Sequence, residues 1–212
     1  MNLRTYLLSF LLVIVSGIRA QYNIDRLLTS GQIALSYDDY VLSIQYFNRI
    51  IELKPYIYQP WQYRAAAKFY LDDFSGAESD ATEAIRLNPF VDNIYDLRAI
   101  SRIKQQKYDL AIDDYSNAIR LNPTNQNFWF NRAICRLNTK DYTRLHLDVD
   151  TIVRKWGKMS QAYILNSEAY LQEKDTIKAV KWLDKGLALD PYNADAWTTR
   201  AYISLARKRW KN

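Results

Sequence analysis

The residues that most often carry catalysis are scarce in this chain of 212 residues. It has one His, His146, and one Cys, Cys135. A single residue of each type excludes a His-rich metal site, a cysteine-based zinc site and a disulfide framework. His146 lies between Leu145 and Leu147, and the sequence shows no nucleophile for which it could act as the base. We therefore expect it to pack against other residues or to lie on the surface. We therefore expect no enzyme activity, no catalytic residues, no metal site and no cofactor.

Carboxylate pairs and phosphate loops also give no sign of catalysis. Asp72-Asp73 and Asp113-Asp114 are adjacent in sequence, so their side chains point to different sides of a turn or helix. Acid–base chemistry on one bond needs two carboxylates that face each other. No Gly-rich phosphate loop follows a strand, because no strand is expected. Cys135 is expected to be a small buried hydrophobe.

Three Arg and three Asp residues recur at a spacing that favours ion pairs. Each Asp follows its Arg by 16 residues, and successive pairs are 34 residues apart. The pairs are Arg64 with Asp80, Arg98 with Asp114 and Arg132 with Asp148. Both partners are lost together elsewhere, where Ser30 stands with Tyr46 and Asn166 with Trp182. Joint presence and joint absence predict a partly buried structural pair that fixes how two helices pack.

The interval between successive pairs, a 34-residue period, organises the rest of the chain. Pro55, Pro89 and Pro123 are one period apart, Pro191 lies two periods further on, and Gly157 takes the skipped position. Large side chains recur at Leu27, Trp61, Tyr95, Trp129, Tyr163 and Trp197. Small residues recur at Gly31, Ala65, Ala99, Ala133, Ser167 and Ala201. These coincident registers predict a repeat architecture rather than one globular core.

Each period is expected to hold two helices. In residues 111–119, apolar side chains return every three or four positions, which is typical of an amphipathic helix. The residue before each Pro is pushed out of the helical region and ends the second helix. Turn-formers such as Asp72-Asp73 separate the two helices. The predicted units are 24–57, 58–91, 92–125, 126–159, 160–193 and the first helix of a sixth at 194–212.

Trp129 with Ala133, then Tyr142 and Ile152, follows the pattern of the tetratricopeptide repeat (TPR), which the chain resembles over residues 24–212. The best-matching unit has Tyr95, Ala99, Tyr108, Ala111, Tyr115, Ala118 and Pro123. Departures from the family pattern occur at Leu145, Gly157 and Gly186. The resemblance implies an all-α fold, a right-handed α-solenoid of helix–turn–helix units. Its concave face, lined by first helices, would bind extended peptides or partner helices.

A series of amides is expected to face this concave groove. It occupies the second position before each large aromatic: Asp25, Gln59, Asn93, Asn127, Gln161 and Asp195. The four middle members both donate and accept hydrogen bonds, so they could bind an extended peptide backbone. The alternative is that they only cap or solvate the first turn of each helix. Tyr63, Phe130 and Asn131 are expected to lie beside them.

Residues 1–20 have the composition of a secretory signal peptide. Arg4 precedes an almost unbroken apolar run over 6–15, and cleavage after Ala20 would leave Gln21 first. The stretch between Arg4 and Arg19 is shorter than the roughly 20 apolar residues that a spanning helix needs. We expect a cleaved signal, no transmembrane span in the mature form and export to the periplasm, cell envelope or exterior. An uncleaved membrane anchor is the alternative.

Composition and charge exclude several further classes. Nearly half of the residues are hydrophobic and only five are Gly and five Pro, which argues against a disordered chain and against a turn-rich β fold. The net charge of +6 falls to +4 without residues 1–20. Spread over the chain, this excess does not predict nucleic-acid binding.

The C-terminal end is expected to be exposed. The sixth first helix carries Trp197, Ala201 and Leu205 with no second helix after it, and Arg200 therefore has no following Asp with which to form the recurring pair. We interpret the chain as part of a longer array, with a terminal cap as the alternative, and expect that this helix could support self-association.

These features predict an exported TPR scaffold that binds a protein or peptide partner through its concave groove and assists cell-envelope complex assembly. One alternative is a helical-repeat module for glycans or nutrients, in which aromatic rings would stack on sugars. Another is the N-terminal interaction region of a longer protein, with a catalytic domain beyond Asn212 as one form of it.

Overall fold

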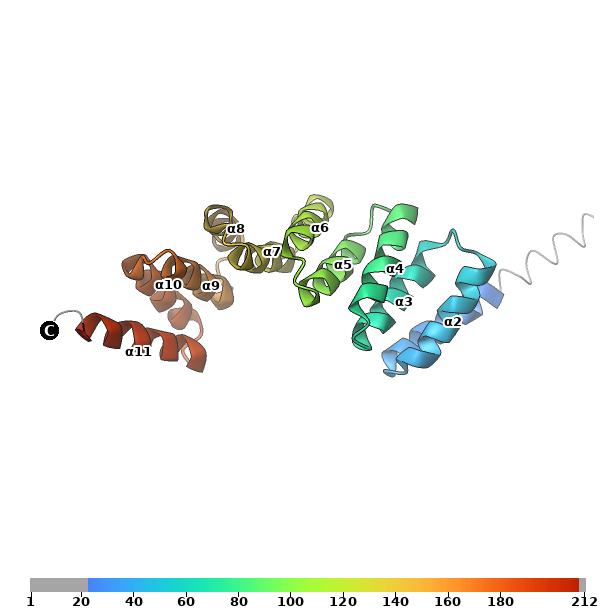
Figure 1. The fold of residues 1–212 in the computed structure, drawn as a ribbon, viewed down its shortest axis with the longest axis horizontal. Coiled ribbons are helices and arrows are strands. Elements are labelled where there is room, and N and C mark those ends of the chain that lie inside the picture. The colour runs from blue at the N-terminus through green and yellow to red at the C-terminus, as the bar shows by residue number, and fades with distance from the viewer. Residues whose placement is uncertain (1–22, 210–212) are drawn as a thin grey trace, which may run out of the picture. The chain divides into compact units, whose positions relative to one another are not determined.

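The computed structural model describes residues 23–209, and side chains up to residue 205; every regular element in this range is an α-helix (Figure 1). The first helix covers residues 23–36. It is followed by α2 (Tyr40–Leu53), α3 (Tyr58–Tyr70), α4 (Phe74–Leu87), α5 (Asp92–Lys104), α6 (Tyr108–Leu121), α7 (Gln126–Asn138), α8 (Tyr142–Lys155), α9 (Ser160–Gln172), α10 (Thr176–Leu189) and α11 (Ala194–Arg209). The predicted all-α class is confirmed, as is the alternation of first and second helices.

Proline sets the end of most second helices. α4 and α6 end at Leu87 and Leu121, and the residues that follow, Asn88 and Asn122, leave the helical region with φ of −145° and −137°. Each stands directly before a Pro, whose ring disfavours helical backbone in the preceding residue. The next first helix then begins within a few residues. The first helices α3, α5, α7, α9 and α11 start at the first residue of the proposed units 58–91, 92–125, 126–159, 160–193 and 194–212.

A tight turn joins the two helices of each pair. One residue of every turn adopts a left-handed backbone conformation although none is Gly; these are Asp38, Asp72, Gln106, Lys140 and Lys174, with φ between 59° and 65°. Such a conformation costs a non-Gly residue about 1 kcal/mol or more. The residue that follows is in most cases an Asp that caps the second helix through its carboxylate: Asp39, Asp73, Asp141 and Asp175. At α6 the same position holds Lys107, which supplies no cap bond.

Contacts divide the chain into two compact units, Met1–Ser101 and Arg102–Asn212. In the first unit, α3 packs between α2 and α4. Its core includes Ile94 together with Ala65, Ala81 and Ala84, and the small side chains of the three alanines let the helix backbones approach closely. Gly31 is required for the same reason, because a Cβ atom there would lie 2.6 Å from the ring of Phe47.

In the second unit, α6 to α11 pack as successive neighbours. Leu145, which departs from the small residue usual in the family, is fully buried and fills a core cluster with Val149, Ile152 and Leu165. Gly157 has φ of +65° and makes the turn after α8 in the position that holds Pro elsewhere. Gly186 lies against Ile164, where an added Cβ would approach within 2.9 Å.

None of the helices in the described range is long and apolar enough to cross a membrane. The proposed signal peptide, residues 1–20, lies outside the described residues.

Candidate protein-interaction site

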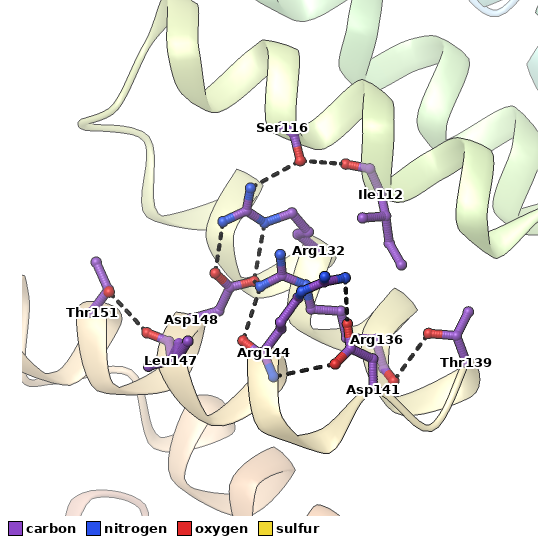
Figure 2. Close-up of polar contacts among 10 residues, drawn as sticks. All are labelled: Ile112, Ser116, Arg132, Arg136, Thr139, Asp141, Arg144, Leu147, Asp148 and Thr151. Carbon is purple, nitrogen blue, oxygen red and sulfur yellow. Dashed lines mark hydrogen bonds and ion pairs between the residues drawn. The ribbon is translucent and has the colours of Figure 1, made fainter.

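A buried ion network holds the helix pair α7–α8 of the second unit (Figure 2). The guanidinium of Arg132 donates to both oxygens of Asp148, at 3.0 Å and 2.7 Å. Arg136, one turn further along α7, donates to the same carboxylate at 2.5 Å. Arg132 also reaches back to the Ser116 hydroxyl of α6 at 2.9 Å. One Arg therefore joins three consecutive helices, and two cations neutralise one buried carboxylate.

The first unit repeats this network with small changes. Arg64 donates to both oxygens of Asp80 at 2.7 Å, and the ammonium of Lys68 lies 2.8 Å from the same carboxylate. Arg64 also donates to Asn48 on α2 at 2.6 Å. The structure thus brings together the predicted residues of two pairs, Arg64 with Asp80 and Arg132 with Asp148.

The third predicted pair, Arg98 with Asp114, stays a prediction because its two residues belong to different units. Within the first unit, Arg98 donates to Thr82 at 3.2 Å. Within the second, Arg102 donates to Asp114 at 2.7 Å. Arg102 lies at the same position of the repeat as Lys68 and Arg136. The sequence analysis missed this second cation, although Lys68, Arg102 and Arg136 follow the same 34-residue period as the predicted pairs.

The large aromatic of each first helix is tied to the preceding loop by its polar group. The indole N–H groups of Trp61, Trp129 and Trp197 donate to the carbonyls of Pro55, Pro123 and Pro191, and the hydroxyls of Tyr95 and Tyr163 to those of Pro89 and Gly157. In three repeats the periodic Arg also lies over this ring: Arg64 over Trp61 at 4.8 Å, Arg98 over Tyr95 and Arg132 over Trp129. The periodic aromatics are therefore packing residues that orient the Arg.

Repeat 160–193, which has Asn166 in place of the Arg, is contacted by His146 of the preceding repeat. His146 stacks on Tyr170 with ring centroids 4.2 Å apart. Its two ring nitrogens lie 2.5 Å from Asn166 Oδ1 and 3.0 Å from Glu173 Oε2. Asn166 is fully buried, and the Trp182 ring packs on Tyr163 and also carries the Lys185 ammonium 5.0 Å from its centroid. His146 is thus a packing residue that links α8 to α9, in agreement with the role expected from its neighbours.

Cys135 has no chemical role in this arrangement. It is fully buried in α7 as a free thiol, and burial raises its pKa to about 12. A thiol that stays protonated is neither a nucleophile nor a metal ligand. In the described part of the chain, no group of three His, Cys, Asp or Glu residues could hold a metal ion.

The predicted groove residues of the first unit differ in environment. Asn93 is exposed near the start of α5, whereas Gln59 is half-buried on α3. Tyr63 stacks on Phe47, with centroids 5.6 Å apart, and packs against the cluster of Ile24 and Ile50. Tyr63 thus contributes to the core between the first two helix pairs.

In the second unit the predicted residues lie on α7 and α9, which contact each other. Asn127 and Gln161 are exposed, whereas Phe130 and Asn131 are half-buried, and Phe130 packs against the core cluster that contains Leu165. The cap of α7 is Asn125, and α9 has Met159 at its cap position without a side-chain bond. Asn127 and Gln161 are therefore not the caps of their helices.

The last helix differs from the expectation in one respect. Arg200 bonds Asp184 of α10 at 2.7 Å, and its Nη1 donates to Ser204 at 2.9 Å. Asp184 lies in the series of Asn48, Thr82 and Ser116, which accept from the Arg of the following unit. Arg200, for which the sequence offered no partner, thus uses the preceding helix. Trp197, Ala201 and Leu205 are exposed, as the sequence analysis expected, and Tyr202 is exposed as well.

Comparisons with known proteins identify the repeats. One family profile, TPR repeat, matches residues 101–136, and a second, tetratricopeptide repeat, matches residues 160–193. The chain therefore contains TPR units. No curated protein matches it in sequence.

Solved structures with the same fold are numerous. The chain resembles YrrB, described as a TPR protein with an unusual peptide-binding site, with a TM-score of 0.79 and 13% identity over 88% of this chain and 97% of that one. It resembles MamA from Desulfovibrio magneticus with a TM-score of 0.74 and 12% identity over 81% and 97% of the two chains. A thermophilic TPR protein in Thermus thermophilus gives a TM-score of 0.57 at 14% identity, over 86% and 99%. These similarities show a TPR fold.

Proposed function

We propose that the chain is an exported TPR scaffold that binds a protein or peptide partner along the exposed faces of its first helices. The observation that carries the proposal is the position of Asn127 and Gln161. Both amides are exposed on neighbouring helices and neither caps its helix. Gln161 Oε1 accepts from the Ser160 hydroxyl at a long 3.4 Å, which leaves its N–H groups and its second lone pair to a partner. An extended backbone offers the complementary groups at regular spacing.

The chemistry of the described side chains also favours binding over catalysis. The thiol of Cys135 is buried, and His146 is engaged by Asn166, Glu173 and Tyr170. The strongest ion networks of the described residues stabilise helix packing. Exposed aromatic rings occur on first helices at Tyr70, Trp197 and Tyr202, and none of them is among the predicted groove residues, so sugar stacking receives no specific support.

The partner-binding proposal is tested by removing the two amides together. Asn127→Ala with Gln161→Ala should abolish recovery of the partner that co-purifies with the wild-type protein from its native envelope fraction. Gln45→Ala, which removes an exposed amide from the second helix α2, is the matched control and should retain it. An unchanged melting temperature would show that the fold is intact. Equal recovery of the same partners by the double variant would contradict the proposal.

Export and envelope location rest on the pattern of residues 1–20. N-terminal sequencing of the protein from fractionated cells should find Gln21 first, in the periplasmic, envelope or external fraction. A protein that begins at Met1 and stays with the membrane would support the anchored alternative, and a cytosolic protein would contradict export. A role in envelope complex assembly follows only if the captured partner is itself an envelope component.

Self-association through the exposed face of α11 is part of the same proposal. Tyr202→Ser with Leu205→Ser should lower the mass measured by light scattering if this face joins two copies, because it removes apolar contact area. An unchanged mass would exclude this face.

A further inference from the structure

The turns of the first unit form one exposed edge that is both acidic and aromatic. The turn after the first helix holds Asp38 and Asp39, and the turn after α3 holds Asp72 and Asp73. Tyr40 and Tyr70 connect the two turns, since their rings stack 5.1 Å apart with an interplanar angle of 14°. We call this surface the acidic edge; it comprises Tyr37, Asp38, Asp39, Tyr40, Val41, Tyr70, Leu71, Asp72 and Asp73.

The acidic edge also exposes a large apolar area. Tyr37 is 81% exposed and Tyr70 60% exposed, and Val41 and Leu71 are exposed beside them. Apolar side chains gathered around one pair of turns favour contact with another macromolecule, because their burial removes about 25 cal/mol per Å² from water. Tyrosine faces next to carboxylates attract an ammonium or guanidinium group by both charge and cation–π interaction.

The second unit has the same edge with the opposite charge. Three periods after Tyr40 and Tyr70, the hydroxyl of Tyr142 donates to Gln172 at 2.8 Å and connects the turns after α7 and α9. The left-handed positions that hold Asp38 and Asp72 in the first unit hold Lys140 and Lys174 here. We call this surface the basic edge; it comprises Lys140, Asp141, Arg144, Lys174, Asp175, Ile177 and Lys178, and its cations outnumber its carboxylates.

Two of the cations on the basic edge neutralise helix caps and two do not. Arg144 pairs with Asp141 at 3.3 Å and Lys178 with Asp175 at 3.0 Å. Lys140 and Lys174 are exposed at the tips of their turns, and within the described residues neither has an ion-pair partner. These two ammonium groups are therefore available to carboxylates of another molecule.

The contrast extends over the part of each unit whose side chains the structure describes. Residues 23–101 carry seven Lys and Arg against eleven Asp and Glu, a net charge of −4. Residues 102–205 carry sixteen against twelve, a net charge of +4. Opposite fields of this kind steer two molecules into contact and set their register.

We propose that the acidic edge of one copy binds the basic edge of a second copy. Lys140 and Lys174 lie at the same positions of their turns as Asp38 and Asp72, so the two edges match in spacing as well as in sign. Tyr37, Tyr70 and Leu71 supply the apolar contact that charge alone lacks. The contact uses neither the first-helix amides nor the exposed face of α11, so it stands independently of the proposed function.

Salt dependence separates this contact from an apolar one. Sedimentation velocity at about 100 µM protein should show dimers or larger species at about 20 mM salt, and monomers at about 500 mM, where charges are screened within a few ångströms. Association through the apolar face of α11 would persist or strengthen in high salt. A wild-type protein that is monomeric at low salt would overturn the proposal.

Charge exchange tests the partner directly. Asp38→Lys with Asp72→Lys, and separately Lys140→Asp with Lys174→Asp, should each weaken self-association by about tenfold or more. A mixture of the two variants should form a mixed complex, because one then carries two basic edges and the other two acidic edges. These exchanges keep a non-Gly residue at each left-handed position, so the fold should survive, as circular dichroism can verify.

The matched control reverses charges of the second unit outside the turns after α7 and α9. Lys158→Asp with Lys181→Asp changes the net charge by the same amount and should leave self-association within about twofold of wild type. A control that dissociates like the turn variant would show that only net charge matters. That result, or failure of the two turn variants to form a mixed complex, would overturn the proposed contact.

Discussion

The two units of the chain share their interior and differ on their surface. Arg64 with Asp80 in the first unit and Arg132 with Asp148 in the second form the same bidentate pair, each supported by a second cation one turn further on. The left-handed positions of the compared turns hold Asp38 and Asp72 in the first unit and Lys140 and Lys174 in the second. The interior repeats because helix packing admits few solutions, whereas an exposed turn leaves its side chain free for recognition.

The largest expected effect comes from removing the shared carboxylate. Asp148→Ala leaves two cations buried without a counter-charge and should lower the free energy of unfolding by about 3 kcal/mol or more. Asp80→Ala should cost less, because the Lys68 side chain is 23% exposed and can turn to water, whereas that of Arg136 is 10% exposed. Urea denaturation followed by circular dichroism measures both.

Asp148→Asn is the control for shape, since it keeps the size of the side chain and loses the charge. The free energy of unfolding of Asp148→Asn should lie between those of the wild type and Asp148→Ala. Equal stability of all these variants would mean that the network does not fix the packing of α7 on α8.

The next effect concerns glycines at close helix contacts. Gly31→Ala places a Cβ atom 2.6 Å from the Phe47 ring and should destabilise the first unit by about 1–3 kcal/mol through overpacking. In Gly186→Ala the added Cβ atom lies 2.9 Å from the flexible Ile164 side chain. The higher helix propensity of Ala offsets about 1 kcal/mol of the cost of this contact. The expected order of melting temperatures is wild type, then Gly186→Ala, then Gly31→Ala; the reverse order would refute the packing argument.

A stabilising change is expected at the turn before α6, where Lys107 supplies no side-chain cap bond. Lys107→Asp should restore the cap that Asp39, Asp73, Asp141 and Asp175 provide elsewhere and raise the free energy of unfolding by about 1 kcal/mol. The carboxylate also suits the positive end of α6 better than the Lys charge does. Lys107→Ala removes the charge without adding an acceptor, so a similar gain for both would assign the effect to charge alone.

The smallest effect should be seen at the left-handed turn residues. Lys140→Gly relieves its backbone conformation and should stabilise the second unit by about 0.5–1 kcal/mol. Asp72→Gly should gain less, because Asp tolerates this conformation better than Lys does. Thermal unfolding measures the difference. Both variants should also weaken self-association, which a purely structural role of these residues would not predict.

Much of the fold was predictable because a short-range pattern repeats. Pro ends the second helices, and a large aromatic followed four positions later by a small residue marks the first helices. A comparison of the chain with itself at an offset of 34 residues therefore suffices to find the helix pairs. The pairing of Arg132 with Asp148 was inferred in the same way. Lys68, Arg102 and Arg136 share this period and were overlooked, as was the uneven charge of the two halves, which counting by halves reveals.

Other features could not be read from periodicity. Asn48, Thr82, Ser116 and Asp184 occupy one series but differ in residue type, so only the structure shows that all accept from an Arg of the next unit. His146 departs from the repeat, and its contacts with Asn166 and Glu173 cross between consecutive helix pairs. Tyr63 was assigned to the groove from its position, yet its ring lies on Phe47.

Zero-length cross-linking tests the contrast between the two edges most directly. Equal amounts of nitrogen-14 and nitrogen-15 protein would be mixed at low salt and treated with a carbodiimide, which joins a carboxylate to an amine in direct contact. The account predicts mixed-isotope peptides that link Asp38 or Asp72 of one copy to Lys140 or Lys174 of another, and their loss in high salt. The absence of such mixed-isotope links from a sample that sediments as a dimer would contradict it.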